Sequence, residues 1–223
     1  MHTIAALDEA HEAHEPPAER DGVRLLVSPG DGAPVHARFR DLPAFLDSGD
    51  LVVVNTSATI PAALDGVLPS ADPVVVHLST ALPGGLWLVE IRSPAAGSSV
   101  PLVVGTPGRV RLLHGGAVDL LRPFMASQRL WIAAVDVDGC VDDYLSLHGR
   151  AIRYKHMPRD WPLAEYQTVF ANAPGSAEMP SAARPFTPEL VTALVAAGVA
   201  IAPLVLHTGV SSLERHESPY PER

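Results

Sequence analysis

Cysteine is almost absent from this sequence, since Cys140 is the single cysteine among 223 residues. One thiol excludes an internal disulfide framework and is typical of proteins in a reducing compartment. An isolated cysteine is more often a small buried apolar side chain than a nucleophile. We therefore predict a cytoplasmic protein in which Cys140 is buried and structural.

Long apolar segments are missing as well. The longest uncharged run, VTALVAAGVAIAPLVL at 191–206, is interrupted by Gly198 and Pro203. It is shorter than the roughly 20 residues that span a bilayer. The first twenty residues carry acids and histidines where a signal peptide needs a basic start and an apolar run. We therefore expect no membrane partner.

Positive charge is scarce, and the formal net charge is −9. This excludes a protein coated in positive charge, although it allows a local basic patch. The stretch HGRAIRYKHMPRDW at 148–161 is such a patch, with two aromatic rings among its cations. Cations beside rings are typical of RNA contacts, and a solvated surface strand is the equally simple alternative. The candidate RNA-binding residues are Arg150, Arg153, Lys155 and Arg159.

Metal-ligand patterns are weak. His2, His11 and His14 have no matching carboxylate or cysteine scaffold, and DVDGCVDD at 136–143 lacks the spacing of a calcium loop. We therefore predict no metal site.

The 47% of hydrophobic residues form two different patterns. Apolar strands are predicted at 23–27, 51–54 and 199–206, the last two of them buried, and helices at 39–46 and 188–197. Between them, VVVHLS, LWLVEIR, RVRLLH and LWIAAVDV are short runs separated by glycine turns, typical of an antiparallel sandwich or barrel. A short helix is predicted at 140–147. The fold class is therefore α/β, with an α/β domain at 1–65 and 148–223 and an inserted all-β domain at 66–147.

The segment YQTVFANAPGSAEMPSAARPFTPEL at 166–190 is a compact loop with four prolines and few charges. It lacks the Gly-x-Ser-x-Gly turn of a hydrolase nucleophile. Gly175 permits close approach of a ligand, serines offer hydroxyl groups, and the helix that starts after Thr187 favours an anionic group at its N-terminus. We interpret the loop as a pocket wall; a rigid structural loop is the alternative.

Four segments carry a resemblance to a known family: RDGVRLLV, FRDLPAFLDSGDLVVVNTSATIPAAL, YQTVFANAPGSAEMPSAARPF and VLHTG. In this order they resemble the S-adenosylmethionine:tRNA ribosyltransferase-isomerases of queuosine biosynthesis. The resemblance implies a distorted-barrel-like α/β domain that carries an inserted small antiparallel β-barrel. It also implies transfer and isomerisation of the ribosyl group of S-adenosylmethionine onto 7-aminomethyl-7-deazaguanine in tRNA, which gives epoxyqueuosine and releases adenine and methionine.

The resemblance also implies site residues and partners. His207, at a predicted strand end, is the candidate for catalytic proton transfer. The partners implied are tRNA and S-adenosylmethionine, the latter as co-substrate, with no metal, and we expect a monomer. The candidate substrate-binding residues are Asn55, Tyr166, Gln167, Gly175, Ser176, Glu178, Pro180, Ser181, Arg184, Phe186 and Gly209.

The sequence departs from the family pattern at several positions. Ala58 and Ala63 stand where the motif has arginines, and Pro185 stands where it has a histidine. Family members also continue beyond the position of Arg223. We therefore expect a truncated member of a divergent branch. The alternatives are a paralogue acting on another nucleoside or sulfonium substrate, and a non-catalytic RNA-binding protein.

Overall fold

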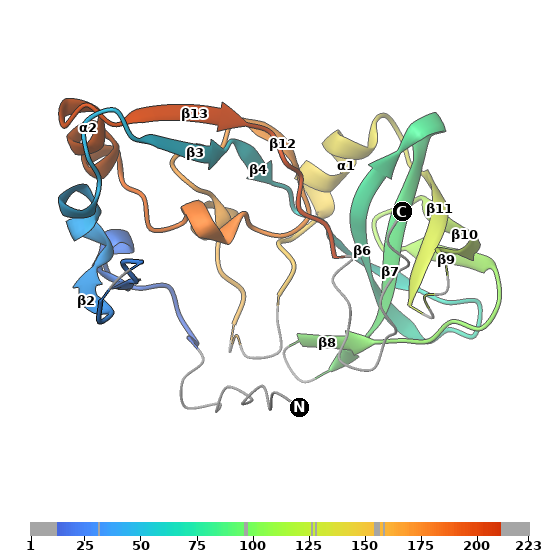
Figure 1. Ribbon diagram of the computed structural model, residues 1–223. Helices are drawn as coiled ribbons and strands as arrows, with labels where there is room; N and C mark the ends of the chain where they lie inside the picture. Colours follow the sequence, from blue (N-terminus) through green and yellow to red (C-terminus); the bar gives the residue numbers. More distant parts are fainter. Residues whose placement is uncertain are drawn as a thin grey trace.

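The computed structural model describes residues 13–30, 32–95, 98–125, 127, 129–153, 157 and 159–210. An antiparallel barrel occupies one end of the molecule, and two short pairs of parallel strands with helix α2 occupy the other (Figure 1). An antiparallel β part and a second part with strands and helices are what the sequence predicted; it did not specify that the strands of the second part pair in parallel. Of the helices among the described residues, none is long and apolar enough to span a membrane.

The barrel is closed by six antiparallel strands. Their order is β11-β10-β9-β5-β6-β7, and β11 pairs with β7 to close the ring. The strands are β5 (Ala63–Val67), β6 (Pro73–Leu82), β7 (Leu86–Ala95), β9 (Gly108–Leu112), β10 (Ala117–Pro123) and β11 (Leu130–Asp136), and β8 (Ser98–Pro101) adds to the outer edge of β7. The four predicted runs correspond to β6, β7, β9 and β11, and their strand character is confirmed.

Sequence patterns missed β5 because Asp65 and Gly66 lie in its middle, and both residue types are depleted in strands. A glycine is required there by packing. A Cβ atom at Gly66 would lie 2.9 Å from the carbonyl oxygen of Arg111 on the neighbouring strand β9. Tertiary packing therefore overrides local propensity at this strand.

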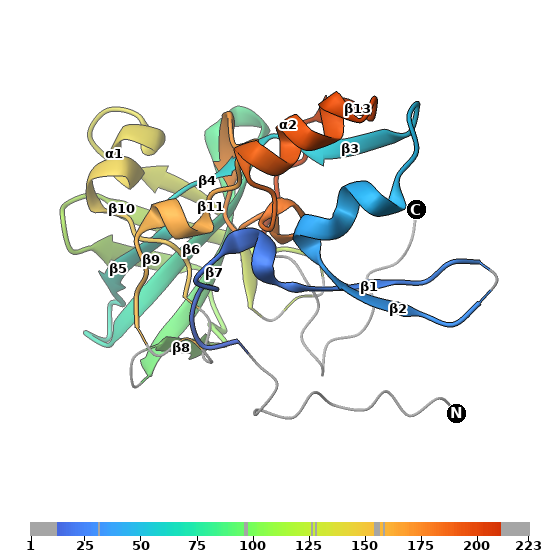
Figure 2. The same ribbon diagram turned by 90° about the vertical axis from the view of Figure 1, so that its left-hand side faces the viewer.

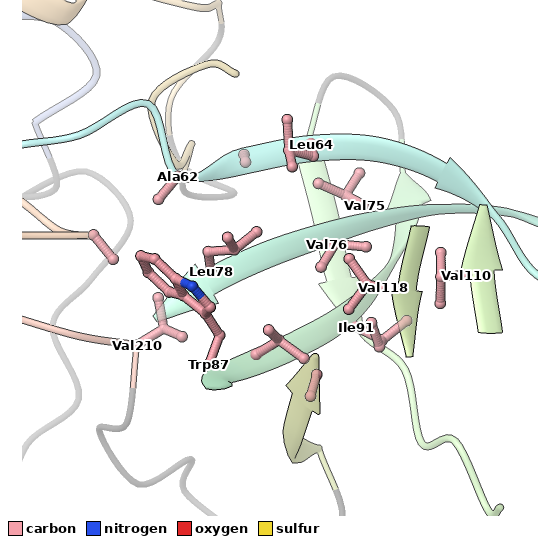
Figure 3. Packing of buried hydrophobic residues seen from close by; sticks show 14 of the residues in the cluster. Ala62, Leu64, Val75, Val76, Leu78, Trp87, Ile91, Val110, Val118 and Val210 are labelled. Atoms are coloured by element: carbon pink, nitrogen blue, oxygen red, sulfur yellow. The ribbon is translucent and has the colours of Figure 1, made fainter. Parts of the chain in front are cut away.

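The barrel interior holds the main hydrophobic core. Val76, Ile91, Val110 and Val118 point toward one another in Figure 3, and each is 0% exposed. The residues of β6 from 74 to 79 are all buried, which is typical of a strand covered on both faces. Strand β6 therefore faces the barrel interior on one side and the rest of the molecule on the other.

A buried charge cluster lies on β6 and its neighbour β7. Glu90 pairs with Arg92 at 2.7 Å and with Arg129 at 3.3 Å, and its second oxygen lies 3.6 Å from Nδ1 of His77. Burial alone would raise the pKa of Glu90, but His77, Arg92 and Arg129 together outweigh it, so this pKa lies below its ordinary value. Desolvation by burial lowers the pKa of His77 despite the nearby carboxylate. At neutral pH the cluster therefore holds an ionised Glu90 and a neutral His77.

We expect the free energy of unfolding to fall when the pH is lowered from about 7 to about 5. The pKa of His77 in the folded chain lies below the unfolded value of about 6.5, so the unfolded chain binds more protons in this interval. One such group contributes at most about 1.4 kcal/mol per pH unit. Urea titrations at several pH values give the free energy of unfolding as a function of pH. Between pH 7 and 5 this free energy should fall less steeply with falling pH in His77→Gln, and as steeply as in the unchanged chain in the exposed control His36→Gln. Equal slopes in both variants would contradict this account.

The second part of the molecule is built on two pairs of parallel strands. Each pair joins segments far apart in sequence: residues 51–55 run beside 200–204, and residues 57–59 run beside 173–176 (Figure 1). One pair is β3 (Leu51–Asn55) with β13 (Ala200–Leu204), the other is β4 (Ser57–Thr59) with β12 (Ala173–Ser176), and a separate antiparallel hairpin joins β1 (Arg24–Val27) to β2 (Val35–Arg38).

A second, smaller core fixes these strands. Phe186, Leu190 and Leu194 are buried in one cluster, and Phe39 packs against it with its ring 5.0 Å from that of Phe186. Figure 2 shows the hairpin β1–β2 extending away from the barrel, below α2 (Pro188–Ala196). The hydroxyl of Thr187 accepts a hydrogen bond from the Leu190 backbone at 3.2 Å, which confirms the predicted N-cap of α2.

Two predictions for this part are wrong in detail. The segment predicted as a helix at 39–46 is a 3₁₀-helix, η3 (Phe39–Phe45), because Pro43 within it has no backbone N–H to donate. The strands predicted as buried are half uncovered: Leu51 and Val53 are 59% and 56% exposed, and Leu204 is 41% exposed. A sheet of two strands leaves apolar side chains facing solvent wherever no second layer covers them.

Short helices complete the chain. Helix α1 (Val141–His148) follows the barrel and confirms the helix predicted at 140–147. Cys140 caps it by accepting a hydrogen bond from the Asp143 backbone at 3.4 Å, and it is exposed, so the prediction of a buried thiol is wrong. Among the described residues, the other 3₁₀-helices are η2 (Arg20–Gly22), η4 (Pro83–Gly85), η5 (Leu163–Tyr166) and η6 (Ser181–Ala183).

Candidate functional site

The parallel strand pairs bring two serines and a histidine together. Ser57 begins β4 and Ser176 ends β12, and their hydroxyl oxygens lie 2.6 Å apart. The segment after β13 carries His207, whose Nδ1 lies 2.7 Å from Ser57 Oγ. Both serines are 0% exposed, whereas His207 is exposed. A titratable imidazole is thus held from behind by buried hydroxyl groups, with its other edge open to solvent.

Gly175 lies against the imidazole of His207. A Cβ atom at this position would lie 2.5, 2.6 and 2.8 Å from Cε1, Nδ1 and Nε2 of the ring, and the φ of Gly175 is +149°. Any larger residue would therefore displace the ring. The backbone of β12 therefore packs against the His207 ring. The sequence predicted close approach of a ligand at Gly175, whereas its close neighbour in the structure is a side chain of the same chain.

The chain around His207 is anchored on both sides. The side-chain amide of Asn55 donates to the carbonyl of Leu206 at 2.7 Å and accepts from the Leu206 N–H at 3.0 Å. On the other side the carbonyl of Thr208 accepts from the backbone of Ala177 at 2.8 Å, and the Thr208 hydroxyl donates to the carbonyl of Glu178. Asn55 therefore acts as a clamp on the His207 segment.

Gln167 is a second clamp. Its amide accepts from the backbone N–H of Thr59 at 2.9 Å and donates to the backbone carbonyl of Thr59 at 2.7 Å. The Thr59 hydroxyl donates to the carbonyl of Tyr166 at 2.8 Å. These bonds attach the start of the loop at 166–190 to the end of β4.

We expect Gln167→Met to lower the free energy of unfolding by about 2 kcal/mol. Methionine has a similar shape but leaves both backbone groups of the buried Thr59 without their partner. Urea denaturation measures the change, and Glu15→Met at an exposed position is the control. Equal stability of the two variants would show that the clamp contributes nothing.

Two cavities meet at the loop. Cavity A, of about 420 Å³, and cavity B, of about 630 Å³, share a wall made by Glu178, Met179 and Ser181. Cavity A is further lined by Trp161, Glu165, Tyr166 and Arg184, and cavity B by Asn55, Pro180, Phe186, Thr208 and Gly209. Both volumes are in the range of small-molecule sites.

The walls of cavity A offer rings, carboxylates and donors. Burial, and to a smaller extent the carboxylate of Asp160, raise the pKa of Tyr166, so its phenol is protonated at neutral pH. Trp161 Nε1 is buried and has no hydrogen-bond partner among the described residues.

Gly209, which lines cavity B, also contacts the barrel. A Cβ atom at Gly209 would lie 2.6 Å from the hydroxyl of Ser79 on β6.

The four residues of the basic stretch have different surroundings. Arg150 forms two bonds of 2.7 Å to the carboxylate of Asp65, and Arg153 pairs with Asp160 at 3.1 Å. The guanidinium of Arg159 lies 4.0 Å above the ring of Trp161. Lys155 lies outside the described residues. Arg150 and Arg153 thus have part of their charge balanced within the molecule.

Ser57, Thr208 and Trp161 are parts of the site that sequence reasoning did not select. A hydroxyl two residues after Asn55 carries no signal until β4 pairs with β12, more than a hundred positions away in the chain. For metal binding, no group of three or more His, Cys, Asp or Glu side chains is placed to hold an ion within the part of the chain that the structure describes.

Comparisons with known proteins identify relatives of the whole described chain. A family model described as "Queuosine biosynthesis protein" matches residues 6–222. The S-adenosylmethionine:tRNA ribosyltransferase-isomerase of Anaeromyxobacter sp. (strain Fw109-5) is 34% identical, over 91% of this chain and 58% of that protein. The enzyme of the same name from Thermus thermophilus is 31% identical, over 95% of this chain and 66% of that protein.

A solved structure is also similar. The crystal structure of S-adenosylmethionine tRNA ribosyltransferase from Thermotoga maritima is 23% identical, covers 93% of this chain and 58% of its own, and gives a TM-score of 0.35. The chain spans less than two thirds of the length of these relatives.

Proposed function

The chain belongs to the queuosine biosynthesis protein family, and from this membership we propose that it acts in the reaction for which its relatives are named. The reaction is transfer and isomerisation of the ribosyl group of S-adenosylmethionine onto 7-aminomethyl-7-deazaguanine in tRNA, with epoxyqueuosine as the product. The observation that carries the proposal is the Ser57–Ser176–His207 cluster beside the loop at 166–190, which walls two ligand-sized cavities. His207 itself lines neither cavity, but its neighbours Leu206 and Thr208 line cavity B.

His207 is the group that we propose contacts the reacting atoms. The sulfonium makes the neighbouring ribose C5′–H acidic, and adenine leaves more readily when a donor interacts with its ring nitrogens. An imidazole is suited to either task near neutral pH. Asn55, Ser57 and Gly175 hold its position, and a fixed position is what transfer between two bound substrates requires.

Cavity A suits S-adenosylmethionine. The rings of Trp161 and Tyr166 line this cavity, and Glu165 and Glu178 add negative charge that attracts an organic cation such as a sulfonium. Arg159 already lies over the Trp161 ring, so Tyr166 is the ring that we place nearest the sulfonium. The Trp161 N–H is a donor for an adenine nitrogen or a carboxylate. Cavity B, across the shared wall, then receives the modified base of tRNA.

The tRNA would approach along the basic stretch. Arg159, stacked on Trp161 at the wall of cavity A, is the residue that we place nearest the bound nucleotide, with Lys155 beside it in sequence. Arg150 and Arg153 attract the tRNA electrostatically from a distance and do not contact it, because Asp65 and Asp160 already bind them. Salt-dependent binding is expected for such contacts.

We also propose that the barrel is an inserted domain, with 66–147 inserted between 1–65 and 148–223, although its first strand, β5, already begins at Ala63. Ala63 and Arg150 exchange backbone hydrogen bonds of 2.9 and 3.0 Å, so the chain enters and leaves the barrel at one place. A single crossing point of this kind supports two separately folded parts.

The proposal is tested by incubating the purified chain with S-adenosylmethionine and tRNA that carries 7-aminomethyl-7-deazaguanine. Nucleoside mass spectrometry should detect epoxyqueuosine, and adenine and methionine should be released in equal amounts. A parallel reaction uses a version extended to the length of the relatives. Absence of epoxyqueuosine from both would overturn the proposal, and consumption of S-adenosylmethionine without tRNA would point to another acceptor. Salt-sensitive tRNA binding without a thermal shift from S-adenosylmethionine would indicate an RNA-binding protein only.

A further inference from the structure

We propose that Ser176 and Ser57 fix His207 in one neutral tautomer, with the proton on Nε2, so that this histidine presents a hydrogen-bond donor to the substrate. The use of that donor in the reaction rests on the function proposed above, whereas the tautomer itself does not.

Ser176, at the end of β12, is fully buried. Its hydroxyl oxygen accepts a hydrogen bond from the backbone N–H of Thr208 at 3.0 Å. Because an N–H only donates, that contact does not use the hydroxyl proton of Ser176. Among the described residues, the other contact of this oxygen is Ser57 Oγ at 2.6 Å. Ser176 therefore donates to Ser57.

The direction of the next bond follows. Ser57 Oγ receives the proton of Ser176, so its own proton is directed to its remaining neighbour, Nδ1 of His207 at 2.7 Å. An Nδ1 that accepts a hydrogen bond carries no proton, so the ring proton of the neutral imidazole is on Nε2. The reverse direction would leave the hydroxyl of the fully buried Ser176 without an acceptor.

The surroundings keep the ring from escaping this arrangement. Gly175 lies flat against the imidazole, and Asn55 ties the backbone of Leu206 to the end of β3. A ring turned by 180° would lie in the same plane but would place Cδ2 instead of Nδ1 against Ser57 Oγ, so it would lose that hydrogen bond. The exposed edge of His207 therefore shows an N–H rather than a lone pair.

The consequence is a specific role for His207. A neutral imidazole with a fixed N–H stabilises negative charge that develops on a substrate atom, without itself acting as the base. In the reaction proposed above, the ring nitrogens of the departing adenine are the acceptors of that kind. Ser57 and Ser176 are then positioning residues, because they act through His207.

The test is NMR of the chain labelled with ¹⁵N-histidine, without tRNA or S-adenosylmethionine, at about pH 8.5, where an ordinary histidine is neutral. The His207 signals are identified by their absence from His207→Gln. We expect Nδ1 in the range of an unprotonated ring nitrogen and Nε2 in the range of a protonated one. A protonated Nδ1 in the unchanged chain would overturn the proposal.

Variants extend the test. Ser57→Ala should shift both nitrogen signals toward the average of the two tautomers, and Ser57→Thr, which keeps the hydroxyl, should restore the original values. Ser70→Ala, at an exposed turn, is the control. Unchanged signals in Ser57→Ala would overturn the proposal. If the expected tautomer is found but no epoxyqueuosine forms, the tautomer stands and the proposed function fails.

Discussion

The His207→Ala variant is expected to form epoxyqueuosine about 10²–10⁴-fold more slowly than the unchanged chain, the range in which a positioned proton-handling group contributes to a rate. The imidazole is held by a bond of 2.7 Å to Ser57, and alanine leaves that buried hydroxyl facing solvent or a void. Single-turnover reactions with saturating tRNA and S-adenosylmethionine measure the effect on the chemical step.

The matched control for this change is His36→Ala, on the exposed strand β2. It should react at the rate of the unchanged chain. Thermal unfolding of both variants separates a loss of chemistry from a loss of structure. If His207→Ala and His36→Ala react equally fast, His207 has no part in the reaction.

Gly175→Ala is expected to lower the same rate by about 10²-fold, the effect of displacing a reacting group by roughly 1 Å. The added methyl carbon would lie 2.5 Å from the His207 ring, and the φ of +149° is unfavourable for alanine. Because the ring is exposed, it can move aside, and the fold should survive. The loss should therefore appear in turnover far more than in stability.

The control for Gly175→Ala is Gly105→Ala, where a Cβ atom meets nothing within 4 Å. Labelled-histidine spectra of the two variants show whether the ring has moved. A Gly175→Ala protein with an unshifted His207 signal and full activity would contradict the packing of Gly175 against the His207 ring.

The loop at 166–190 connects the two cavities, because one of its segments lines both of them. Glu178, Met179 and Ser181 face both cavities, and the residues before them are tied to Thr59 and Thr208. A ligand in cavity A therefore touches the same segment that shapes cavity B. The prolines and the Gln167 clamp restrict how far that segment can move.

Local patterns predicted the parts of the fold that depend on neighbours in sequence. The strands of the barrel with alternating or β-branched residues, the helix after Thr187 and the pocket-wall loop follow from propensity, capping and turn chemistry, which act within about ten residues. The resemblance to the family likewise rested on contiguous blocks such as those around Asn55 and Gly175.

Tertiary structure alone decided the contacts between distant segments. Parallel pairing of β4 with β12 places Ser57 against Ser176 and His207, and Asp65 binds Arg150 across 85 positions. The exposure of Leu51 and Val53 depends on which layers cover a sheet, and the apolar residues themselves do not report this. Sequence reasoning thus proposed the histidine as a candidate, while long-range strand pairing placed the hydroxyl groups of Ser57 and Ser176 beside it, because hydrogen bonds form between atoms close in space rather than in sequence.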